Sequence, residues 1–256
     1  QMLSQRTIKN KITCSGVGLH TGKKVKLTFH PAEPNTGILF RRIDGDKVVD
    51  IPATAKNVGE TTLSTTLVYG DYKISTIEHL LSALAGTGVD NCIIDCDGPE
   101  IPIMDGSSTQ FVFLIQTAGI VEQNAVKKFV YVTKSVQVQR DDAVARIKPY
   151  DGFRVTFTLE FDHPVYNKYP HSASIDFSQT SFIREVSRAR TFGLMDDLEK
   201  LKKMNLALGA NLNNAIGIGD EDVLNEGGLR FADEFVKHKI LDAIGCLLYT
   251  SDAADE

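Results

Sequence analysis

The sequence predicts an α+β protein made of two similar β/α halves packed face to face. Stretches with the alternating apolar pattern of strands are interspersed with stretches of helical apolar spacing. After Gly119 the strand pattern starts again, as a second series. In addition, residues 235–245 align with residues 76–86, which places His238 over His79. Two related halves that meet at these histidines would explain all three observations.

Composition and charge bound the classes of function. Of the 256 residues, 42% are hydrophobic and 24% are charged, which is typical of globular domains and sufficient for a sizeable core. The net charge of −5 excludes a global basic surface for nucleic acid. The longest apolar runs are too short to cross a membrane, and the N-terminus has no secretory signal pattern. The scattered cysteines lack zinc-knuckle spacing, so we expect a reduced, cytoplasmic protein with Cys92 and Cys96 buried on one strand.

The first half is expected to cover residues 1–124 and to consist mainly of strands. Alternating patterns predict strands at 5–14, 24–30, 37–42, 62–68 and 90–95. A glycine-rich connection at 15–22 is followed by a strand, whereas a phosphate-binding loop would be followed by a helix, so we reject that function for it. His20 and Thr21 in this connection remain candidates for lining a cleft.

Two helices are expected in the first half. The first covers about 75–86, with Ser75 or Thr76 as its N-cap and Gly86 as its end. The second covers about 109–118.

The second half is expected to cover residues 125–245, with an inserted element at about 193–222 that contains a short charged helix. Its expected strands are 128–139, 143–149, 152–161 and 175–177, and a helix is expected near 180–187. Apolar residues at three- to five-residue steps predict a last helix over 231–245, and Gly245 is a natural stop for it.

Candidate metal ligands lie on two of these helices. His238 and Asp242 are four residues apart, so their side chains share one helix face and can hold two corners of one metal ion. A surface ion pair would use the same spacing. Glu78 and His79 open another helix; His79 would add a second nitrogen, and Glu78 would suit a general base beside a catalytic zinc ion. A carboxylate at that position is equally explained by its favourable interaction with the helix dipole.

Longer motifs occur in order along the chain. They are Gly-Val-Gly-Leu-His-Thr-Gly (16–22), Ile-Ser-Thr-Ile-Glu-His-Leu (74–80), Pro-Glu-Ile-Pro-Ile-Met-Asp-Gly-Ser (99–107), Ser-Arg-Ala-Arg-Thr-Phe-Gly (187–193), Leu-Asn-Glu-Gly-Gly-Leu-Arg-Phe (224–231) and His-Lys-Ile-Leu-Asp-Ala-Ile-Gly (238–245). On these motifs the chain from about Gln5 to Gly245 closely resembles the zinc-dependent UDP-3-O-acyl-N-acetylglucosamine deacetylases of lipid A biosynthesis in Gram-negative bacteria.

The resemblance implies a fold and a reaction. Each half would be a sheet layered with two helices, with the active site between the halves. One zinc ion per chain would be held by His79, His238 and Asp242, and iron(II) would suit the same ligands. The resemblance further implies that Glu78 is the general base and that Thr191 helps to hold the oxyanion of the hydrolysed acetamide.

The resemblance also implies substrate contacts, at Lys239, Phe192, Phe161, Leu19 and His20. Lys239 would lie near the sugar-nucleotide phosphates, and Phe161 near the uracil, although a phenylalanine at a strand end is also common in a core. Phe192 and the inserted element would form the passage for the acyl chain, although core packing would explain the apolar residues of the insertion equally well. The implied partner is a small-molecule UDP-sugar lipid, with no nucleic acid and no transmembrane segment, and we expect a monomer.

The resemblance ends at Gly245. The family continues with an aspartate and several tens of residues that carry a histidine with an acid role, whereas this chain has residues 246–256, which we expect to be an unrelated tail beginning at Cys246. We therefore expect little activity from this chain as it stands. Two alternatives remain open: a non-catalytic protein that binds zinc and a sugar nucleotide, and a structural β/α protein in which these side chains meet by chance.

Overall fold

A five-stranded sheet forms one layer of the structure. The computed structural model describes residues 2–59, 61 and 63–250. The strand order of this sheet is β2-β3-β8-β4-β5, antiparallel throughout except for the parallel pair β4–β8. The strands are β2 (Ile12–Val17), β3 (Lys24–Pro31), β4 (Ile38–Asp44), β5 (Lys47–Pro52) and β8 (Cys92–Cys96). Cys92 and Cys96 are both fully buried on β8, as predicted.

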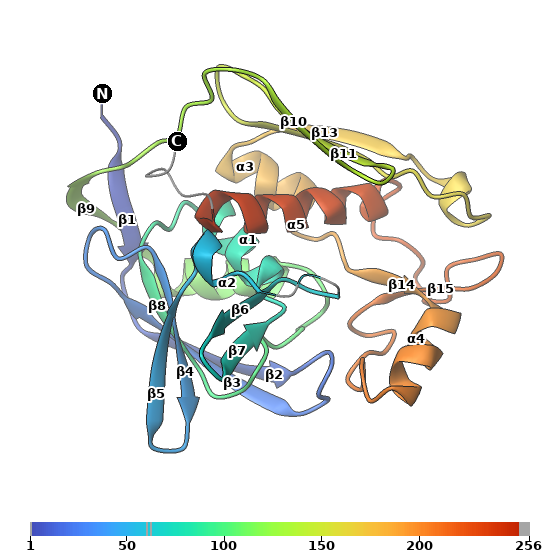
Figure 1. Ribbon diagram of the computed structural model, residues 1–256, viewed down its shortest axis with the longest axis horizontal. Coiled ribbons are helices and arrows are strands. Elements are labelled where there is room, and N and C mark those ends of the chain that lie inside the picture. Colours follow the sequence, from blue (N-terminus) through green and yellow to red (C-terminus); the bar gives the residue numbers. More distant parts are fainter. Residues whose placement is uncertain (1, 60, 62, 251–256) are drawn as a thin grey trace.

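Two helices, α1 (Glu78–Gly86) and α2 (Thr109–Ala118), pack against this sheet (Figure 1). Leu80 of α1 and Phe111 of α2 are fully buried in the same apolar cluster as Phe29 of β3. The first half is therefore the expected sheet layered with two helices. Smaller elements complete it: the pair of β1 (Ser4–Ile8) with β9 (Ile120–Val126), the hairpin of β6 (Thr66–Tyr69) with β7 (Tyr72–Ser75), and the 3₁₀ turn η1 (Ala55–Asn57).

The described strands of the second half form pairs. They are β10 (Val136–Arg140) with β11 (Ala143–Ile147), β12 (Arg154–Thr158) with β13 (Ser172–Asp176), and the parallel pair β14 (Phe192–Leu194) with β15 (Ile216–Ile218). The helical elements are η2 (Tyr166–Lys168), α3 (Gln179–Ser181) with the π-helical turn η3 (Phe182–Val186), α4 (Met195–Lys203) and α5 (Glu234–Thr250). In Figure 1, α5 lies between α1 on one side and the strands β10, β11 and β13 on the other.

The contact of α1 with α5 joins the two halves. Ile240 and Ile244 of α5 are fully buried and belong to the same cluster as Leu80 of α1. Gly245 permits this close approach, because a Cβ atom there would lie only 2.2 Å from the carbonyl oxygen of Glu78. The junction predicted from the alignment of the two helices is thus present, with His79 and His238 on its two sides.

The last helix is longer than predicted at one end and shorter at the other. It begins at Glu234, three residues after the expected start, and continues past Gly245 to Thr250. The expected stop at Gly245 is wrong, because this glycine is used for the helix contact and helical hydrogen bonding continues beyond it. Residues 251–256 of the expected tail lie outside the described residues.

Several other boundaries also differ from the prediction. The expected strand at 5–14 is two strands, β1 and β2, separated by a turn at residues 9–11. The N-cap of α1 is Ile77, without a side-chain hydrogen bond, so the expected cap at Ser75 or Thr76 is wrong; Ser75 belongs to β7. The strand expected over 62–68 begins at Thr66, and Thr62 lies outside the described residues.

Candidate metal centre

Three predicted ligands converge where α1 meets α5. Nε2 of His79 and Nε2 of His238 each lie 3.4 Å from Oδ1 of Asp242, and the two imidazole centroids are 4.8 Å apart. One ligand atom from each residue fits within 4.8 Å of the others. In a tetrahedral site with bonds of about 2.1 Å, neighbouring ligand atoms are about 3.4 Å apart. The spacing therefore fits a shared metal ion better than direct hydrogen bonds, which are shorter.

The two helices orient these side chains. His238 and Asp242 project from the same face of α5 one turn apart, and His79 is the second residue of α1. Nδ1 of His238 donates a hydrogen bond to the carbonyl oxygen of Ala189 at 2.9 Å, because a carbonyl can only accept. This bond places the proton on Nδ1 and leaves the lone pair of Nε2 facing Asp242.

The charge states of the site also suit a metal. Burial lowers the pKa of His238 to about 4, so this imidazole is neutral at neutral pH. Burial acts to raise the pKa of Asp242, but the neighbouring imidazoles of His238 and His79 outweigh it and lower the pKa to about 2. Burial acts to lower the pKa of His79, but the Asp242 carboxylate 3.4 Å away outweighs it, so this pKa is raised. A bound cation would take the place of that proton, since histidine ligates through a neutral ring.

Glu78 lies beside this cluster at the first position of α1. Its side chain is buried and accepts a hydrogen bond from the backbone N–H of Thr65. Burial raises its pKa, against the opposing effect of His79. A carboxylate with a raised pKa next to a metal site has the property that a general base needs at neutral pH.

Two further predicted residues lie close to His238. The ring of Phe192 lies 6.2 Å from that of His238, and Nζ of Lys239 lies 5.4 Å from the centroid of Phe192. Thr191, which directly precedes Phe192, is fixed through its backbone, because its N–H donates to Gly106 O at 2.8 Å and its carbonyl accepts from Ile216 N at 2.8 Å. The predicted contact of its hydroxyl with an oxyanion stays a prediction.

Phe161 is not a core residue. It is 45% exposed and packs edge-on against Tyr166 at 5.0 Å, and Tyr166 in turn contacts Phe192 at 5.7 Å. This exposed position is compatible with the predicted contact to a ligand and disagrees with the alternative of core packing.

Leu19 and His20 lie against the inserted element. Their carbonyl oxygens accept from Gly209 N and Leu208 N at 2.9 and 3.0 Å, and Nδ1 of His20 accepts from Ala207 N at 3.3 Å. Glu100 holds the other side of this turn by accepting from His20 N, Thr21 N and Thr21 Oγ1. The described contacts of Leu19 and His20 are thus with the insertion and Glu100, and their predicted contact with a substrate stays a prediction.

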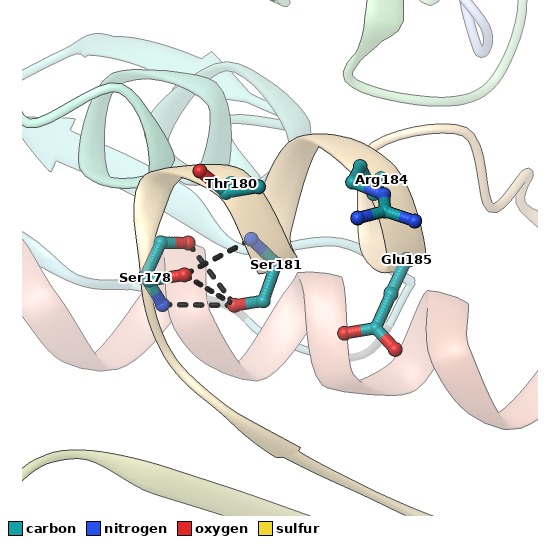
Figure 2. Close-up of a pocket in the computed structure, with 5 residues that line it drawn as sticks. All are labelled: Ser178, Thr180, Ser181, Arg184 and Glu185. Atoms are coloured by element: carbon teal, nitrogen blue, oxygen red, sulfur yellow. Dashed lines mark hydrogen bonds between the residues drawn. The ribbon is translucent and has the colours of Figure 1, made fainter.

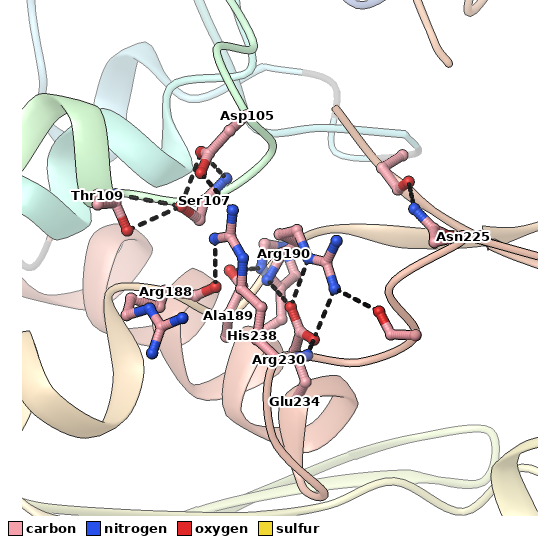
Figure 3. Close-up of polar contacts among 12 residues, drawn as sticks. Asp105, Ser107, Thr109, Arg188, Ala189, Arg190, Asn225, Arg230, Glu234 and His238 are labelled. Carbon is pink, nitrogen blue, oxygen red and sulfur yellow. Dashed lines mark hydrogen bonds and ion pairs between the residues drawn. The ribbon is translucent and has the colours of Figure 1, made fainter. Parts of the chain in front are cut away.

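The structure also shows a polar network that the sequence did not predict (Figure 3). Arg190 pairs with the buried Glu234 at 2.8 Å, and Arg230 pairs with Asp105 at 2.9 Å. The hint in the sequence is the position of two residues relative to predicted site residues: Arg190 directly precedes Thr191, and Glu234 lies one helical turn before His238. Neither position shows that the side chains meet.

A separate surface pocket lies at the start of α3. It is lined by Ser178, Thr180, Ser181, Arg184 and Glu185 (Figure 2). The hydroxyls of Ser178 and Ser181 form a capping box that starts the helix. This pocket contains none of the predicted site residues, so we do not assign the reaction to it.

Within the described residues no helix has the length and apolarity that a bilayer crossing requires.

Comparisons with known proteins agree with the metal site inferred from the geometry. Residues 5–253 match the LpxC family, described as UDP-3-O-acyl N-acetylglycosamine deacetylase, and the match continues past Cys246, where an unrelated tail was expected. The chain is 60% identical over 246 residues to a UDP-3-O-acyl-N-acetylglucosamine deacetylase of Methylococcus capsulatus, covering 96% of this chain and 81% of that protein. With the matching fold and the converging His-His-Asp cluster, this chain belongs to the LpxC family of UDP-3-O-acyl-N-acetylglycosamine deacetylases.

Proposed function

We propose that this protein hydrolyses the acetamide of UDP-3-O-acyl-N-acetylglucosamine in lipid A biosynthesis, with a zinc ion held by His79, His238 and Asp242. Family membership and the function of the Methylococcus relative support the reaction. The observation that carries the metal assignment is the 3.4 Å spacing of both Nε2 atoms from Asp242 Oδ1. We also propose a cytoplasmic location, since Cys14, Cys92 and Cys96 are in the thiol form.

When bound, zinc would supply a Lewis acid and lower the pKa of a coordinated water to about 7. His79, His238 and Asp242 would supply two neutral imidazoles and one carboxylate, which is a donor set of known catalytic zinc sites. Iron(II) would fit the same donors, so metal analysis of the purified protein distinguishes the two ions.

Glu78 would move the protons of the reaction. Its carboxylate takes a proton from the attacking water, and the resulting carboxylic acid can return that proton to the departing nitrogen. Burial favours both steps by raising the pKa of Glu78, which makes the protonated form accessible. The hydroxyl of Thr191, on a backbone held at both ends, would donate to the oxyanion that develops on the acetamide carbonyl.

Lys239 and Phe192 would bind the remainder of the substrate. The ammonium group of Lys239 lies beside the Phe192 ring and next to the metal ligand His238, where it can meet an anionic group of a sugar nucleotide. The inserted element would border the acyl chain, and its backbone hydrogen bonds to Leu19 and His20 would hold it against the first half.

The test is release of acetate from UDP-3-O-acyl-N-acetylglucosamine, measured together with zinc content. Glu78→Ala is expected to retain zinc and to lose about 10²–10⁴-fold in rate, since general base catalysis contributes that much. Asp242→Ala is expected to lose zinc as well as activity. Arg154→Lys changes an exposed ion pair in the second half and serves as the control. Stoichiometric zinc binding by the unaltered chain without any acetate release would overturn the proposal.

A further inference from the structure

A buried carboxylate lies one helical turn before the ligand His238. Glu234 is the first residue of α5 and is 0% exposed. Its Oε2 accepts from the backbone N–H of Arg190 at 3.0 Å and from Arg190 Nε at 2.8 Å. Its Oε1 accepts from Arg190 Nη2 at 3.0 Å and from the backbone N–H of Arg230 at 2.7 Å. Because every bond of this carboxylate is made inside the protein, Glu234 and Arg190 hold each other in a single arrangement (Figure 3).

One peptide unit connects this ion pair to the metal site. The N–H of Arg190 and the carbonyl of Ala189 belong to the same planar peptide group and point in opposite directions. The N–H is held by Glu234, and the carbonyl oxygen accepts from Nδ1 of His238 at 2.9 Å. Two side chains from consecutive turns of α5 thus hold the two ends of one peptide plane. A tilt of that plane would disturb the hydrogen bond that sets the orientation of the His238 ring.

The same contacts bear on Thr191 and on the first half. Thr191 follows Arg190 directly, so the position of its backbone depends on the same ion pair. Arg230 adds a connection across the halves, because its Nη2 donates to Asp105 Oδ2 at 2.9 Å and its Nη1 donates to the carbonyl of Arg188 at 2.9 Å. The segment 188–191 is therefore held from α5 and from the loop that precedes α2.

We propose that Glu234 and Arg190 are positioning residues of the metal centre, acting through the 189–190 peptide plane. They keep the proton of His238 on Nδ1 and leave its Nε2 for the metal. In known metal sites the group that orients a histidine ligand is a carboxylate, carbonyl or water, and its loss costs about 10–100-fold in metal affinity. In this protein the carboxylate of Glu234 acts on His238 indirectly, through the peptide group whose carbonyl belongs to Ala189. The inference rests on the proposed ligation of zinc by His238.

The first measurement is the zinc dissociation constant of metal-free protein, determined by competition with a chelator. Glu234→Gln removes the charge and one of the acceptor atoms, and we expect zinc to bind about 10–100-fold more weakly. Arg190→Lys keeps the positive charge beside Glu234 but loses the planar guanidinium group that contacts both carboxylate oxygens, so we expect a smaller loss of zinc affinity. Arg154→Lys makes the same replacement in the exposed pair with Asp176, whose distance is also short at 2.9 Å, and should leave zinc affinity unchanged.

The second measurement reports on His238 without any metal. Imidazole proton–nitrogen correlation spectra at neutral pH should show His238 with its proton on Nδ1 in the unaltered protein and in Arg154→Lys. In Glu234→Gln this tautomer should no longer be the only one. If Glu234→Gln does not fold, as judged by its thermal transition, Arg190→Lys is judged by the same two criteria.

The outcomes separate the two proposals. Failure of the unaltered chain to bind zinc would overturn the proposed metal site, and this inference with it. Normal zinc binding by the unaltered chain, with affinity and His238 tautomer unchanged in the variants, would overturn the inference alone. If Glu234 and Arg190 only stabilise the fold and do not position His238, the variants would have a lower melting temperature while the proton of His238 stays on Nδ1.

Discussion

At Glu78 the requirements of folding and of the proposed reaction are opposed. Burial raises the pKa of this carboxyl, so the folded protein binds its proton more tightly than the unfolded chain does. The corresponding stabilisation is present below the unfolded pKa of about 4.3 and is lost as pH rises through the folded value. At neutral pH the buried charge is therefore unfavourable for folding, while the reaction uses it as a base.

Glu78→Gln should consequently stabilise the metal-free protein while abolishing most of its activity. We expect a higher melting temperature at pH 7.5, a difference that shrinks as the pH approaches 4, and a rate about 10²–10⁴-fold lower. Thermal melts over this pH range and acetate release measure the two effects. A lower melting temperature at pH 7.5 would show that hydrogen bonds of the carboxylate, including the one from Thr65, outweigh the cost of burial.

The cysteine thiols should react slowly in the folded protein. Burial raises the pKa of Cys14 and Cys96 to about 11 and that of Cys92 to about 12. Since the thiolate is the reacting form, we expect thiol-specific reagents at pH 8 to modify these residues much more slowly than in urea-unfolded protein. Mass spectrometry of labelled peptides gives each rate, and fast modification of Cys92 in the folded state would contradict the buried position on β8.

At the scale of elements, the contact of α1 with α5 depends on the absence of a side chain at Gly245. Gly245→Ala would place a Cβ atom 2.2 Å from the carbonyl oxygen of Glu78, and a helix backbone cannot rotate out of the way as a side chain can. Overpacking of this kind costs about 1–3 kcal/mol, whereas alanine gains about 1 kcal/mol in helix propensity. At a contact as close as 2.2 Å the clash should outweigh the gain, so we expect a net loss of up to about 2 kcal/mol in the free energy of unfolding. We also expect weaker activity, because Glu78 and Asp242 move apart.

Gly227→Ala is the matched control for this prediction. A Cβ atom at Gly227 would meet nothing within 4 Å, and its backbone requires no glycine-specific conformation. Urea unfolding of both variants gives the comparison. Equal stability of the two would mean that α1 and α5 can separate without cost.

At the scale of the molecule, one core spans both predicted halves. Val155, Phe182 and Ile240 of the second half belong to the same buried cluster as Phe29 and Leu80 of the first. The predicted boundary near residue 125 therefore does not coincide with a gap in the apolar packing. Halves that share a core should unfold together.

Hydrogen exchange in increasing denaturant should show this cooperativity. We expect amides of α1 and α5 to share one opening free energy, close to that of global unfolding. Amides of β10 and β11, whose residues are all exposed, should exchange with a much smaller opening free energy. Different opening free energies for α1 and α5 would indicate halves that unfold independently.

Much of the fold and the candidate site was predictable because its signals are local. The helical spacing of Leu80 and Leu84 predicted α1, and the alternation around Leu27 predicted β3. The four-residue step from His238 to Asp242 placed both side chains on one face before any contact was known. The pairing of this face with His79 came from the alignment of the two helices and from the family motifs, and the structure brings the three together.

The rest was decided by tertiary contacts between residues far apart in the sequence. Glu234 and Arg190 are separated by 44 residues, and only the packing of α5 against segment 188–191 brings them together. The same is true of Gly245, which looked like a helix stop because glycine has low helix propensity, but which lies buried against Glu78. Periodicity and spacing therefore determined which elements form and which side chains share a face. Close packing between elements decided which backbone groups support the ligands, because such contacts leave no periodic signal in the sequence.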